Sequence, residues 1–340
     1  MRILIIGGTG FTGPRVARRL WDEGHEVVLF HRGQTPAELP PAIRHIYGER
    51  RDLPSFINDF KNLSPAVVLD MIAYTEEDAR VLTRTFKRLA RRVVCISSAD
   101  VYGAYGRLLG MESGPPDPLP LKEDAPLRQA LYPYRAHAAG PHDWTYDYEK
   151  ILVERVVMGE PELPGTVLRL PAVYGPKDKQ HRLFEYLKRM DDGRPFILLE
   201  EKKAGWRWTR GYVENVAAAI ALAVTNEQAA GKIFNLGEPS ALTEKAWVQS
   251  IALAASWDGE IILAPKSVLP GTMNADYTRH LATDTSRLRL ELGYAEHVPL
   301  QQALRETIEW ERAHPPPEVN GAQFDYAAED EILKRLTERP

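Results

Sequence analysis

The beginning of the chain carries the feature that most restricts its fold. An apolar run, Ile3-Leu4-Ile5-Ile6, leads into the turn Gly7-Gly8-Thr9-Gly10-Phe11-Thr12-Gly13, and a helical pattern with Val16, Ala17 and Leu20 on one face follows. Glycines at this point let a pyrophosphate approach the backbone and let the helix pack closely on the strand, with the helix amino end facing the phosphates. The order predicts a dinucleotide site, with contacts from Gly7, Gly10, Phe11, Thr12 and Gly13.

Apolar runs and helical patterns then alternate along the first half of the chain. This alternation predicts an α/β fold of the Rossmann type, a doubly wound parallel sheet with helices on both faces. Strands are expected at 2–6, 26–30, 43–47, 66–71, 93–97 and 166–170. We assign residues 1–175 to this domain. Residues 176–340 have a less regular pattern and are expected to form a smaller substrate-binding lobe, with elements that could return to the first domain.

Three residues are candidates for catalysis. Ser98 ends an apolar strand, where an open α/β sheet places its ligand crevice. Tyr146 and Lys150 are four residues apart, a spacing that puts them on one face of a predicted helix. A nearby ammonium lowers the pKa of a phenol from its usual value of about 10, so Tyr146 could act as a base. Tyr148 would lie on another face of that helix and is interpreted as packing or surface.

Taken together, these segments resemble the extended short-chain dehydrogenase/reductase family, in its sugar epimerase and dehydratase branch. The resemblance covers most of the chain and rests on the glycine turn, the Tyr146 and Lys150 pair, and further motifs at 97–103, 168–176, 211–217 and 234–237. It implies a nicotinamide cofactor, with Lys150 on its ribose hydroxyls and Ser98 hydrogen-bonded to the reacting oxygen. It also implies a homodimer.

The resemblance narrows the reaction. Dehydratases of the family carry an adjacent Asp-Glu pair where this chain has Ala99 and Asp100. We therefore expect an epimerase that acts on a sugar or sugar nucleotide by transient hydride abstraction and return. One alternative is an NADP-linked reductase or dehydrogenase that releases its product. Another is a non-catalytic, RNA-associated binding protein, as some relatives are. Asp100 is a candidate substrate contact, or else a structural hydrogen-bond partner of the loop.

The second predicted strand bears on the choice of cofactor. NAD enzymes usually have an acid at its end to bind the adenosine ribose, whereas this chain has His31 and Arg32. A guanidinium there could meet a 2′-phosphate, so we favour NADP over NAD. Arg32 could equally stack on adenine or face solvent. By resemblance, Glu49 and Asp70 border the adenine and the cofactor ends of the strands.

Two usual anchors of a sugar nucleotide are absent. By resemblance, an asparagine is expected where Ala172 stands, and an arginine that grips the diphosphate is expected where Trp208 stands. Arg207 and Arg210 flank Trp208 and are candidate substrate contacts for anionic oxygens, with indole faces available for stacking. The alternative is that the tryptophans pack the second lobe while the arginines face solvent.

Composition excludes several classes of protein. A net charge of −4 with interspersed signs gives no basic footprint, so we expect no nucleic-acid partner. The histidines lack the spacing of a zinc site, and we expect no metal.

The first apolar run is too short for a secretory core or a membrane span, which predicts a cytoplasmic protein. The single cysteine, Cys95, lies in a predicted buried strand and is expected to be unreactive. The Pro- and Gly-rich segment 111–141 is expected to form a lid or specificity loop.

Overall fold

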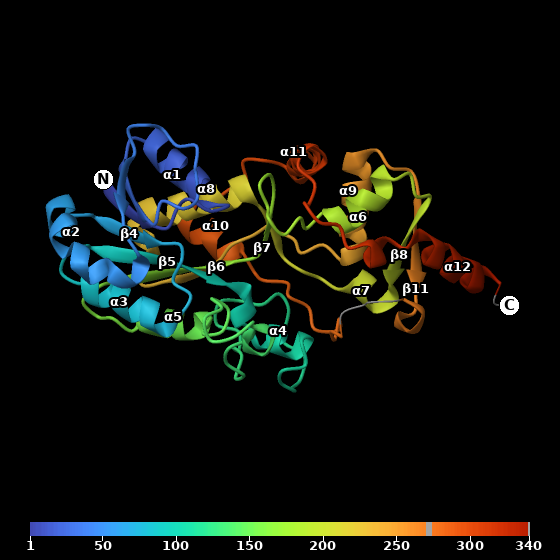
Figure 1. Ribbon diagram of the computed structural model, residues 1–340. Helices are drawn as coiled ribbons and strands as arrows, with labels where there is room; N and C mark the ends of the chain where they lie inside the picture. Colours follow the sequence, from blue (N-terminus) through green and yellow to red (C-terminus); the bar gives the residue numbers. More distant parts are fainter. Residues whose placement is uncertain (270–273, 339–340) are drawn as a thin grey trace.

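The computed structural model describes residues 1–269 and 274–338. A larger lobe carries the amino terminus and a smaller lobe carries the carboxyl-terminal helix (Figure 1). Within the described residues, the larger lobe contains a seven-stranded sheet in the order β10-β6-β5-β4-β1-β2-β3, and every neighbouring pair is parallel. The strands are β1 (Arg2–Ile6), β2 (Glu26–His31), β3 (Arg44–Tyr47), β4 (Val67–Asp70), β5 (Arg92–Ser98), β6 (Gly165–Leu170) and β10 (Ile233–Asn235). The predicted Rossmann-type α/β fold is confirmed.

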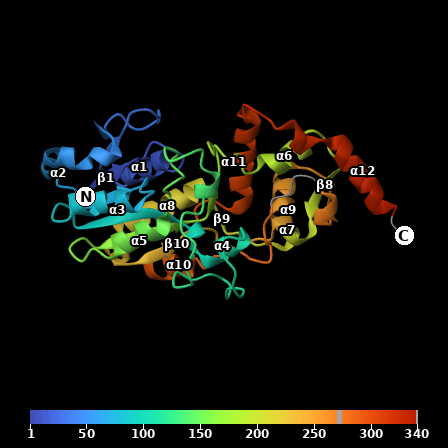
Figure 2. The ribbon, with the colours of Figure 1, turned by 60° about the horizontal axis from the view of Figure 1, so that its bottom comes forward.

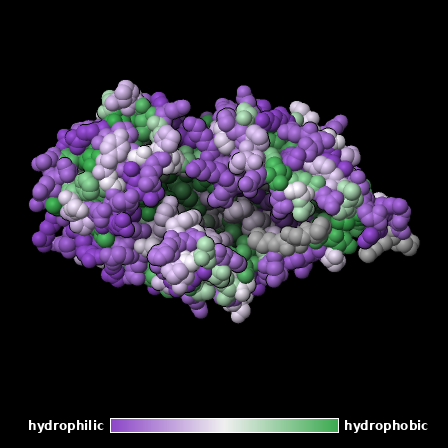
Figure 3. All heavy atoms as spheres, viewed as in Figure 1, coloured by the Kyte–Doolittle hydropathy of each residue, from purple (hydrophilic) through white to green (hydrophobic). Residues whose placement is uncertain are grey.

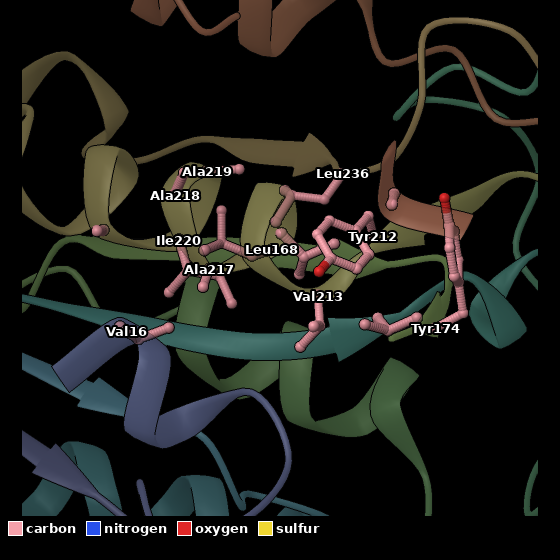
Figure 4. Close-up of a cluster of buried hydrophobic side chains, with 14 of the residues drawn as sticks. Val16, Leu168, Tyr174, Tyr212, Val213, Ala217, Ala218, Ala219, Ile220 and Leu236 are labelled. Atoms are coloured by element: carbon pink, nitrogen blue, oxygen red, sulfur yellow. The ribbon is translucent and has the colours of Figure 1, made fainter. Parts of the chain in front are cut away.

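Helices cover both faces of this sheet because its strands are apolar on both sides. Alternate β1 residues Ile3 and Ile5 belong to the core beneath α1 (Gly13–Asp22) and α8 (Val213–Thr225). Leu4 and Ile6 point to the opposite core. That second face is covered by α2 (Ile57–Leu63), α3 (Glu76–Phe86) and α5 (Lys150–Met158). Figure 4 shows side chains of α1, β6 and α8 meeting in the first of these cores.

The chain returns to the sheet after residue 175. Helix α8 packs on α1, β10 pairs with β6 in parallel, and α10 (Ser286–Leu292) packs against both α8 and β10. Residues after 175 therefore contribute elements to the larger lobe as well as to the smaller one. The short strands β7 (Ala172–Tyr174) and β9 (Arg210–Tyr212) pair beside the larger lobe.

The smaller lobe is mainly helical. Its two strands, β8 (Phe196–Glu200) and β11 (Glu260–Ala264), pair in parallel. Its helices are α6 (Phe184–Asp191), α7 (Glu201–Gly205), α9 (Glu244–Ala255), α11 (Leu300–Ala313) and α12 (Tyr326–Thr337). A second view separates this lobe from the sheet, with α4 (Gly103–Leu108) between them (Figure 2). The surface is hollowed between the lobes, and hydrophobic residues form part of the hollow (Figure 3).

Helix α5 begins at Lys150, later than the sequence predicts. Its N-cap is Glu149, whose side chain accepts a hydrogen bond from the Ile151 amide at 2.9 Å. Tyr146 lies in the turn before the helix, where its amide donates to the Asp143 carbonyl at 2.9 Å. The prediction that Tyr146 and Lys150 share a helix face is therefore wrong. The buried capping carboxylate of Glu149 sets the first turn.

The Pro- and Gly-rich segment 111–141 crosses the carboxyl end of the sheet, where Arg169 of β6 donates to the Glu123 carbonyl and Asn235 of β10 donates to the Leu121 carbonyl, and it is also bridged to neighbouring loops. Leu127 forms an isolated antiparallel bridge with Tyr102, and Leu121 forms a parallel bridge with Thr283. The guanidinium of Arg107 pairs with Glu112 and Asp117 within the segment. Among the described helices, none is long and apolar enough to cross a membrane.

Candidate active site

A serine, an aspartate and a tyrosine meet at the carboxyl end of β5. Ser98 is the last residue of that strand, and its hydroxyl accepts a hydrogen bond from the Asp100 amide at 3.2 Å. The phenol of Tyr148 donates to Oδ2 of Asp100 at 2.9 Å. Ser98 lies close enough to the same phenol to lower its pKa by hydrogen bonding. Tyr148, which we interpreted as packing or surface, is thus the tyrosine that the fold brings to Ser98.

A second tyrosine reaches Asp100 from the long segment. The phenol of Tyr134 donates to the same Oδ2 at 2.9 Å, and Tyr105 of α4 donates to Tyr134 at 3.1 Å. Asp100 is buried, and its other oxygen, Oδ1, has no hydrogen-bond partner among the described residues. A buried acceptor without a partner costs free energy, so this oxygen is a candidate contact for a substrate hydroxyl.

Burial shifts the pKa of each ionisable group in this cluster in the direction that favours its neutral form. Burial raises the pKa of Tyr148 well above its usual value, and the Asp100 carboxylate raises it further. Burial also raises the pKa of Asp100, although Arg128 and the two phenols oppose the shift. The pKa of Lys150 is lowered, again chiefly by burial. Loss of water around each group disfavours its charged form, which accounts for all three directions.

Lys150 lies at the start of α5, beneath the two aromatic rings of Tyr74 and Tyr148. Its ammonium donates to the carbonyls of Ala73 at 2.7 Å and Ile96 at 2.8 Å. The nitrogen lies 4.8 Å from the ring centre of Tyr74 and 5.7 Å from that of Tyr148. Lys150 therefore joins the ends of β4 and β5, and it accompanies Tyr148 rather than Tyr146.

Tyr146 is held elsewhere by an arginine of the long segment. The Arg135 guanidinium lies 4.8 Å from the ring centre of Tyr146 and donates to its carbonyl at 3.0 Å. The ring is half-buried. A catalytic role for Tyr146 stays a prediction, and this position gives it no support.

A buried ion pair fixes the start of α5. Arg128 and Glu149 approach to 3.2 Å, and both side chains are fully excluded from water. Glu149 also accepts from the Tyr132 amide at 2.6 Å. Arg128 donates to the carbonyls of Asp100 and, at 2.5 Å, Ala130. The pair ties the long segment to the helix that carries Lys150, and sequence reasoning identified neither partner.

The last residues of β5 and β6 rest on a second buried network. Arg169 pairs with Glu154 of α5 at 2.7 Å, and its guanidinium donates to the Tyr102 phenol oxygen at 2.9 Å. The hydroxyl of Ser97 donates to Glu154, while Tyr102 donates to Asn235 of β10 at 2.6 Å. These bonds join three strands and α5 directly beneath Ser98, which fixes the site on rigid elements.

The glycine turn has the shape that a dinucleotide needs. Gly7 and Gly8 have positive φ angles of 88° and 85°, which favour glycine. A Cβ on Gly13 would lie 2.5 Å from the backbone of Gly8, so helix and turn approach too closely for a side chain there. A Cβ on Gly10 would meet nothing within 4 Å. Gly10 therefore leaves open space beside the amino end of α1, where Thr12 is the N-cap.

A cavity of about 690 Å³ adjoins this turn. Gly10 and Phe11 line it, with α1 on one side and Thr35 to Glu38 on the other. The other predicted cofactor residues are not in its lining. Arg15 does not point freely into it, because its guanidinium bonds Phe11, Pro176 and Glu214.

The two residues proposed for a 2′-phosphate differ in their surroundings. His31 bonds His45 at 2.7 Å between ring nitrogens, and burial lowers its pKa, which disfavours a positive charge. Arg32 is exposed. Of the pair, Arg32 alone is placed to reach an anion.

Asp70 is fully buried at the end of β4. Its carboxylate pairs with Arg50 and accepts from the Ile72 amide at 2.9 Å. This geometry supports a positioning role for Asp70, and its place beside the cofactor stays a prediction. Glu49 caps the short helix that begins at Arg50, without a side-chain cap bond. Nη1 of Arg50 is buried and has no partner among the described residues. Arg50 is therefore a further candidate for a cofactor contact at the end of β4.

The predicted substrate arginines form hydrogen bonds with parts of the chain other than the Ser98 cluster. Arg210 is buried and pairs with Glu244 of α9, with its guanidinium 4.4 Å from the Trp247 ring centre. This pairing makes Arg210 part of the smaller lobe's packing. Arg207 is exposed and donates to the Ala241 carbonyl at 2.8 Å. A substrate role remains a prediction for Arg207 and has less support for Arg210.

The described residues contain neither a cluster that could hold a metal ion nor an accessible thiol. In the part of the chain that the structure describes, no group of three or more His, Cys, Asp or Glu side chains could hold a metal ion. Burial raises the pKa of Cys95 to about 12, which keeps the thiol protonated and unreactive at neutral pH.

A comparison with known protein families finds a family model that covers both the glycine turn and the Ser98 strand. The model of the NAD dependent epimerase/dehydratase family matches residues 3–237, well over half of the chain. The chain belongs to this family. Family membership agrees with the Rossmann fold, and the family's description names NAD-dependent epimerases and dehydratases. It leaves open which reaction of the class is catalysed.

Three curated relatives show how varied the class is. The 2′-dehydrokanamycin reductase of Streptomyces kanamyceticus is 28% identical over 69% of this chain and 61% of its own length. The chain thus spans less than two thirds of that relative. The Arabidopsis thaliana chloroplast stem-loop binding protein of 41 kDa b is 24% identical over 90% of this chain and 78% of its own length. The Bacillus cytotoxicus UDP-N-acetyl-alpha-D-glucosaminuronate decarboxylase is 24% identical over 92% of this chain and 98% of its own length.

Solved structures show the same fold. The Bordetella bronchiseptica enzyme WbmG in complex with NAD has a TM-score of 0.67 and 18% identity, over 92% of this chain and 94% of that one. The Thermus thermophilus UDP-glucose 4-epimerase complex with NAD has a TM-score of 0.63 and 21% identity, over 92% and 100%. At such low identities these likenesses concern the fold alone.

Proposed function

We propose that this protein catalyses nicotinamide-dependent hydride transfer at a hydroxyl-bearing carbon of a sugar or sugar nucleotide. The observation that carries the proposal is the convergence of Ser98, a buried phenol and Lys150 at the carboxyl end of the sheet, in a chain with an open glycine turn. Ligands of open α/β sheets bind at this edge, so a substrate carbon and a cofactor would meet there.

The residues present fit a nicotinamide dinucleotide. The space beside Gly10 and the amino end of α1, which has no side-chain cap hydrogen bond, suit a pyrophosphate. When bound, the nicotinamide supplies or accepts the hydride. Ser98 would hold the reacting oxygen by a hydrogen bond, and Lys150 would keep positive charge at the ends of β4 and β5. The buried phenol beside Ser98 would move the hydroxyl proton.

Epimerisation is the form of this chemistry that we first expected. It requires the same phenol to take a proton and then return it, while the hydride leaves and re-enters on opposite faces of the carbon. Ala99 supports it against dehydration, since one acid of the usual elimination pair is missing. An epimerase recycles its cofactor and converts one sugar into another without net oxidation.

Net reduction is the second candidate, and one observation favours it. The phenol beside Ser98 has a strongly raised pKa and is thus a proton donor, which is the state that carbonyl reduction consumes. The relation to a dehydrokanamycin reductase points in the same direction. Net reduction does not require a nucleotide on the substrate. The guanidinium of Arg210 is paired with Glu244 and so is not available for a diphosphate, which supports a substrate without a nucleotide.

The choice between NAD and NADP depends on Arg32. The family description and the NAD complexes among the structural neighbours favour NAD. Our preference for NADP rests on the exposed Arg32 guanidinium alone. If it meets a 2′-phosphate, Arg32→Ala will weaken NADP binding about tenfold, close to 1.4 kcal/mol, and leave NAD binding unchanged. Equal effects on both cofactors would place Arg32 on the adenine or in solvent.

The absorbance of the reduced nicotinamide at about 340 nm tests the function. Purified protein is mixed with NAD or NADP and a panel of sugars, sugar nucleotides and keto sugars. An isomerised product without net cofactor reduction supports the epimerase. Stoichiometric consumption of reduced cofactor supports the reductase. If no substrate exchanges hydride, the RNA-associated reading takes the place of the enzyme, and binding to stem-loop RNA is then measured by its salt dependence.

Assembly and location are proposals as well. The family resemblance supports a homodimer, and light scattering of the purified protein checks its mass. A cytoplasmic location is likewise a proposal, and fractionation of cells that produce the protein checks it.

A further inference from the structure

We propose that Tyr148, held by Asp100 and Tyr134, is the phenol that exchanges a proton with the substrate oxygen, in place of the Tyr146 of the Tyr-x-x-x-Lys motif. This inference rests on the proposed hydride transfer. It differs from the motif-based assignment by two residues, which changes the side chain that performs the step.

The backbone decides between the two tyrosines. Because α5 starts at Lys150, Tyr146 lies in a preceding turn and not on the helix face of Lys150. Tyr148 immediately precedes the N-cap Glu149, and its ring lies beside the Lys150 ammonium. The spacing of the tyrosine and the lysine that lie together in this chain is therefore Tyr-x-Lys.

The hydrogen bonds also select Tyr148. Its phenol reaches the carboxylate of Asp100, and the amide of Asp100 binds the Ser98 hydroxyl. Tyr146 is instead covered by Arg135. A phenol that acts on an oxygen held by Ser98 must lie within hydrogen-bond reach of the same point, and the cluster provides that for Tyr148.

Asp100 and Tyr134 act as positioning residues. Both phenols donate to Oδ2 of Asp100, so the carboxylate fixes the position of the Tyr148 oxygen, and the O–H bond turns from Asp100 to the substrate oxygen for the transfer. Tyr134 belongs to the long segment, which links that segment's docking to the geometry of Tyr148. Oδ1 of Asp100 is left for a neighbouring hydroxyl of the substrate.

The proton balance of the reducing step is simple. A hydride adds to the carbonyl carbon, and the electron pair of the carbonyl bond moves to oxygen. The Tyr148 O–H bond breaks as the new substrate O–H bond forms. The phenolate then regains a proton from water after the product leaves. In the oxidising direction each of these events is reversed.

Several charged or titratable groups face Tyr148 and will shape its pH dependence. Asp100 faces it from the turn after β5, Tyr134 from the long segment, Tyr74 from the end of β4, and Lys150 from α5. Asp100 and Tyr74 raise the pKa of the phenol, whereas Ser98 lowers it. Replacing Asp100 by Asn removes a negative charge and will lower the pKa of Tyr148.

The decisive experiment compares Tyr148→Phe with Tyr146→Phe, because each removes one hydroxyl and keeps the ring. We expect Tyr148→Phe to lower kcat at least about 100-fold, with unchanged melting temperature and cofactor dissociation constant. Tyr146→Phe is expected to stay within about twofold of the wild type. The opposite pattern would restore the motif tyrosine and overturn the inference.

Two further readouts separate this inference from the proposed function. The tyrosinate absorbance of the wild type minus that of Tyr148→Phe reports one phenol, which should ionise above the usual pH and move to lower pH in Asp100→Asn. Tyr134→Phe should change the pH profile of kcat while KM stays constant. An active wild type with an unaffected Tyr148→Phe sinks this inference alone. A wild type without turnover on any substrate overturns both proposals.

Discussion

Arg128 and Glu149 form an ion pair 3.2 Å apart, and neither side chain is accessible to water. The two residues come from different parts of the chain, the long segment and the start of α5. Their pairing places the first turn of the helix, and with it Tyr148 and Lys150, next to Ser98. The catalytic geometry therefore depends on a contact that lies outside the reacting groups.

Removal of one partner of this pair should be costly. Arg128→Ala leaves Glu149 as an uncompensated buried charge, and we expect the free energy of unfolding to fall by about 3–5 kcal/mol. Chemical denaturation followed by circular dichroism measures the change. Arg84→Ala, which breaks the exposed pair with Glu77, is the matched control and should change stability by less than about 1 kcal/mol.

A double variant tests whether the loss of stability in Arg128→Ala comes from the unpaired charge of Glu149. In the double variant Arg128→Met with Glu149→Gln, no buried charge is left unpaired, and a glutamine can still cap α5. This variant should recover part of the stability lost in Arg128→Ala. A double variant no more stable than the single one would show that packing, and not charge, fixes this junction.

The glycine turn offers two substitutions with different consequences. Gly13→Ala places a Cβ 2.5 Å from the Gly8 backbone, so it should lower the melting temperature. Gly10→Ala places its Cβ in open space and should leave the melting temperature unchanged. It should nevertheless weaken cofactor binding by about tenfold or more, because the methyl group occupies room that a pyrophosphate needs. Calorimetry with NAD tests both variants, and tight binding by Gly10→Ala would contradict the proposed cofactor position.

Trp144 provides a test of how burial controls Tyr148. Its indole packs edge-on against Tyr148, with ring centres 6.0 Å apart, although it is 63% exposed itself. Burial is the main cause of the raised pKa of Tyr148, so Trp144→Ala should lower that pKa towards its usual value. Oxidation of an alcohol needs the phenolate and should then begin at lower pH. Trp21→Ala on α1 is the control, and an equal shift there would contradict the argument.

Cys95 should behave as an inert thiol. Since burial raises its pKa to about 12, the thiolate is scarce below that pH in the folded protein. We expect no reaction with a disulfide reagent at pH 8 under native conditions. One thiol should react once the protein is unfolded, because the chain has a single cysteine. Rapid native labelling would mean that β5 opens readily.

Much of the fold could be predicted from local pattern. The strands expected at 2–6, 26–30 and 166–170 lie where the apolar runs placed them, within one residue at each end, because these segments are bounded by their own turn residues. The glycine turn also keeps its predicted form, since positive φ angles at Gly7 and Gly8 are a local requirement. The pairing of β10 with β6 could not be predicted from local pattern, because it joins parts of the chain that are far apart in sequence.

In the candidate site, too, local sequence determines some features and tertiary contacts determine others. Sequence by itself determined the Rossmann unit, the place of Ser98 at a strand end and the presence of Lys150 at the following helix, all of which depend on neighbours in the chain. It could not determine where that helix begins. Asp143, Thr145 and Asp147 are residues that commonly cap helices, yet the cap is Glu149. Only the tertiary structure decided this, because Arg128 stabilises the buried Glu149 carboxylate and so places Tyr148, instead of Tyr146, beside Ser98.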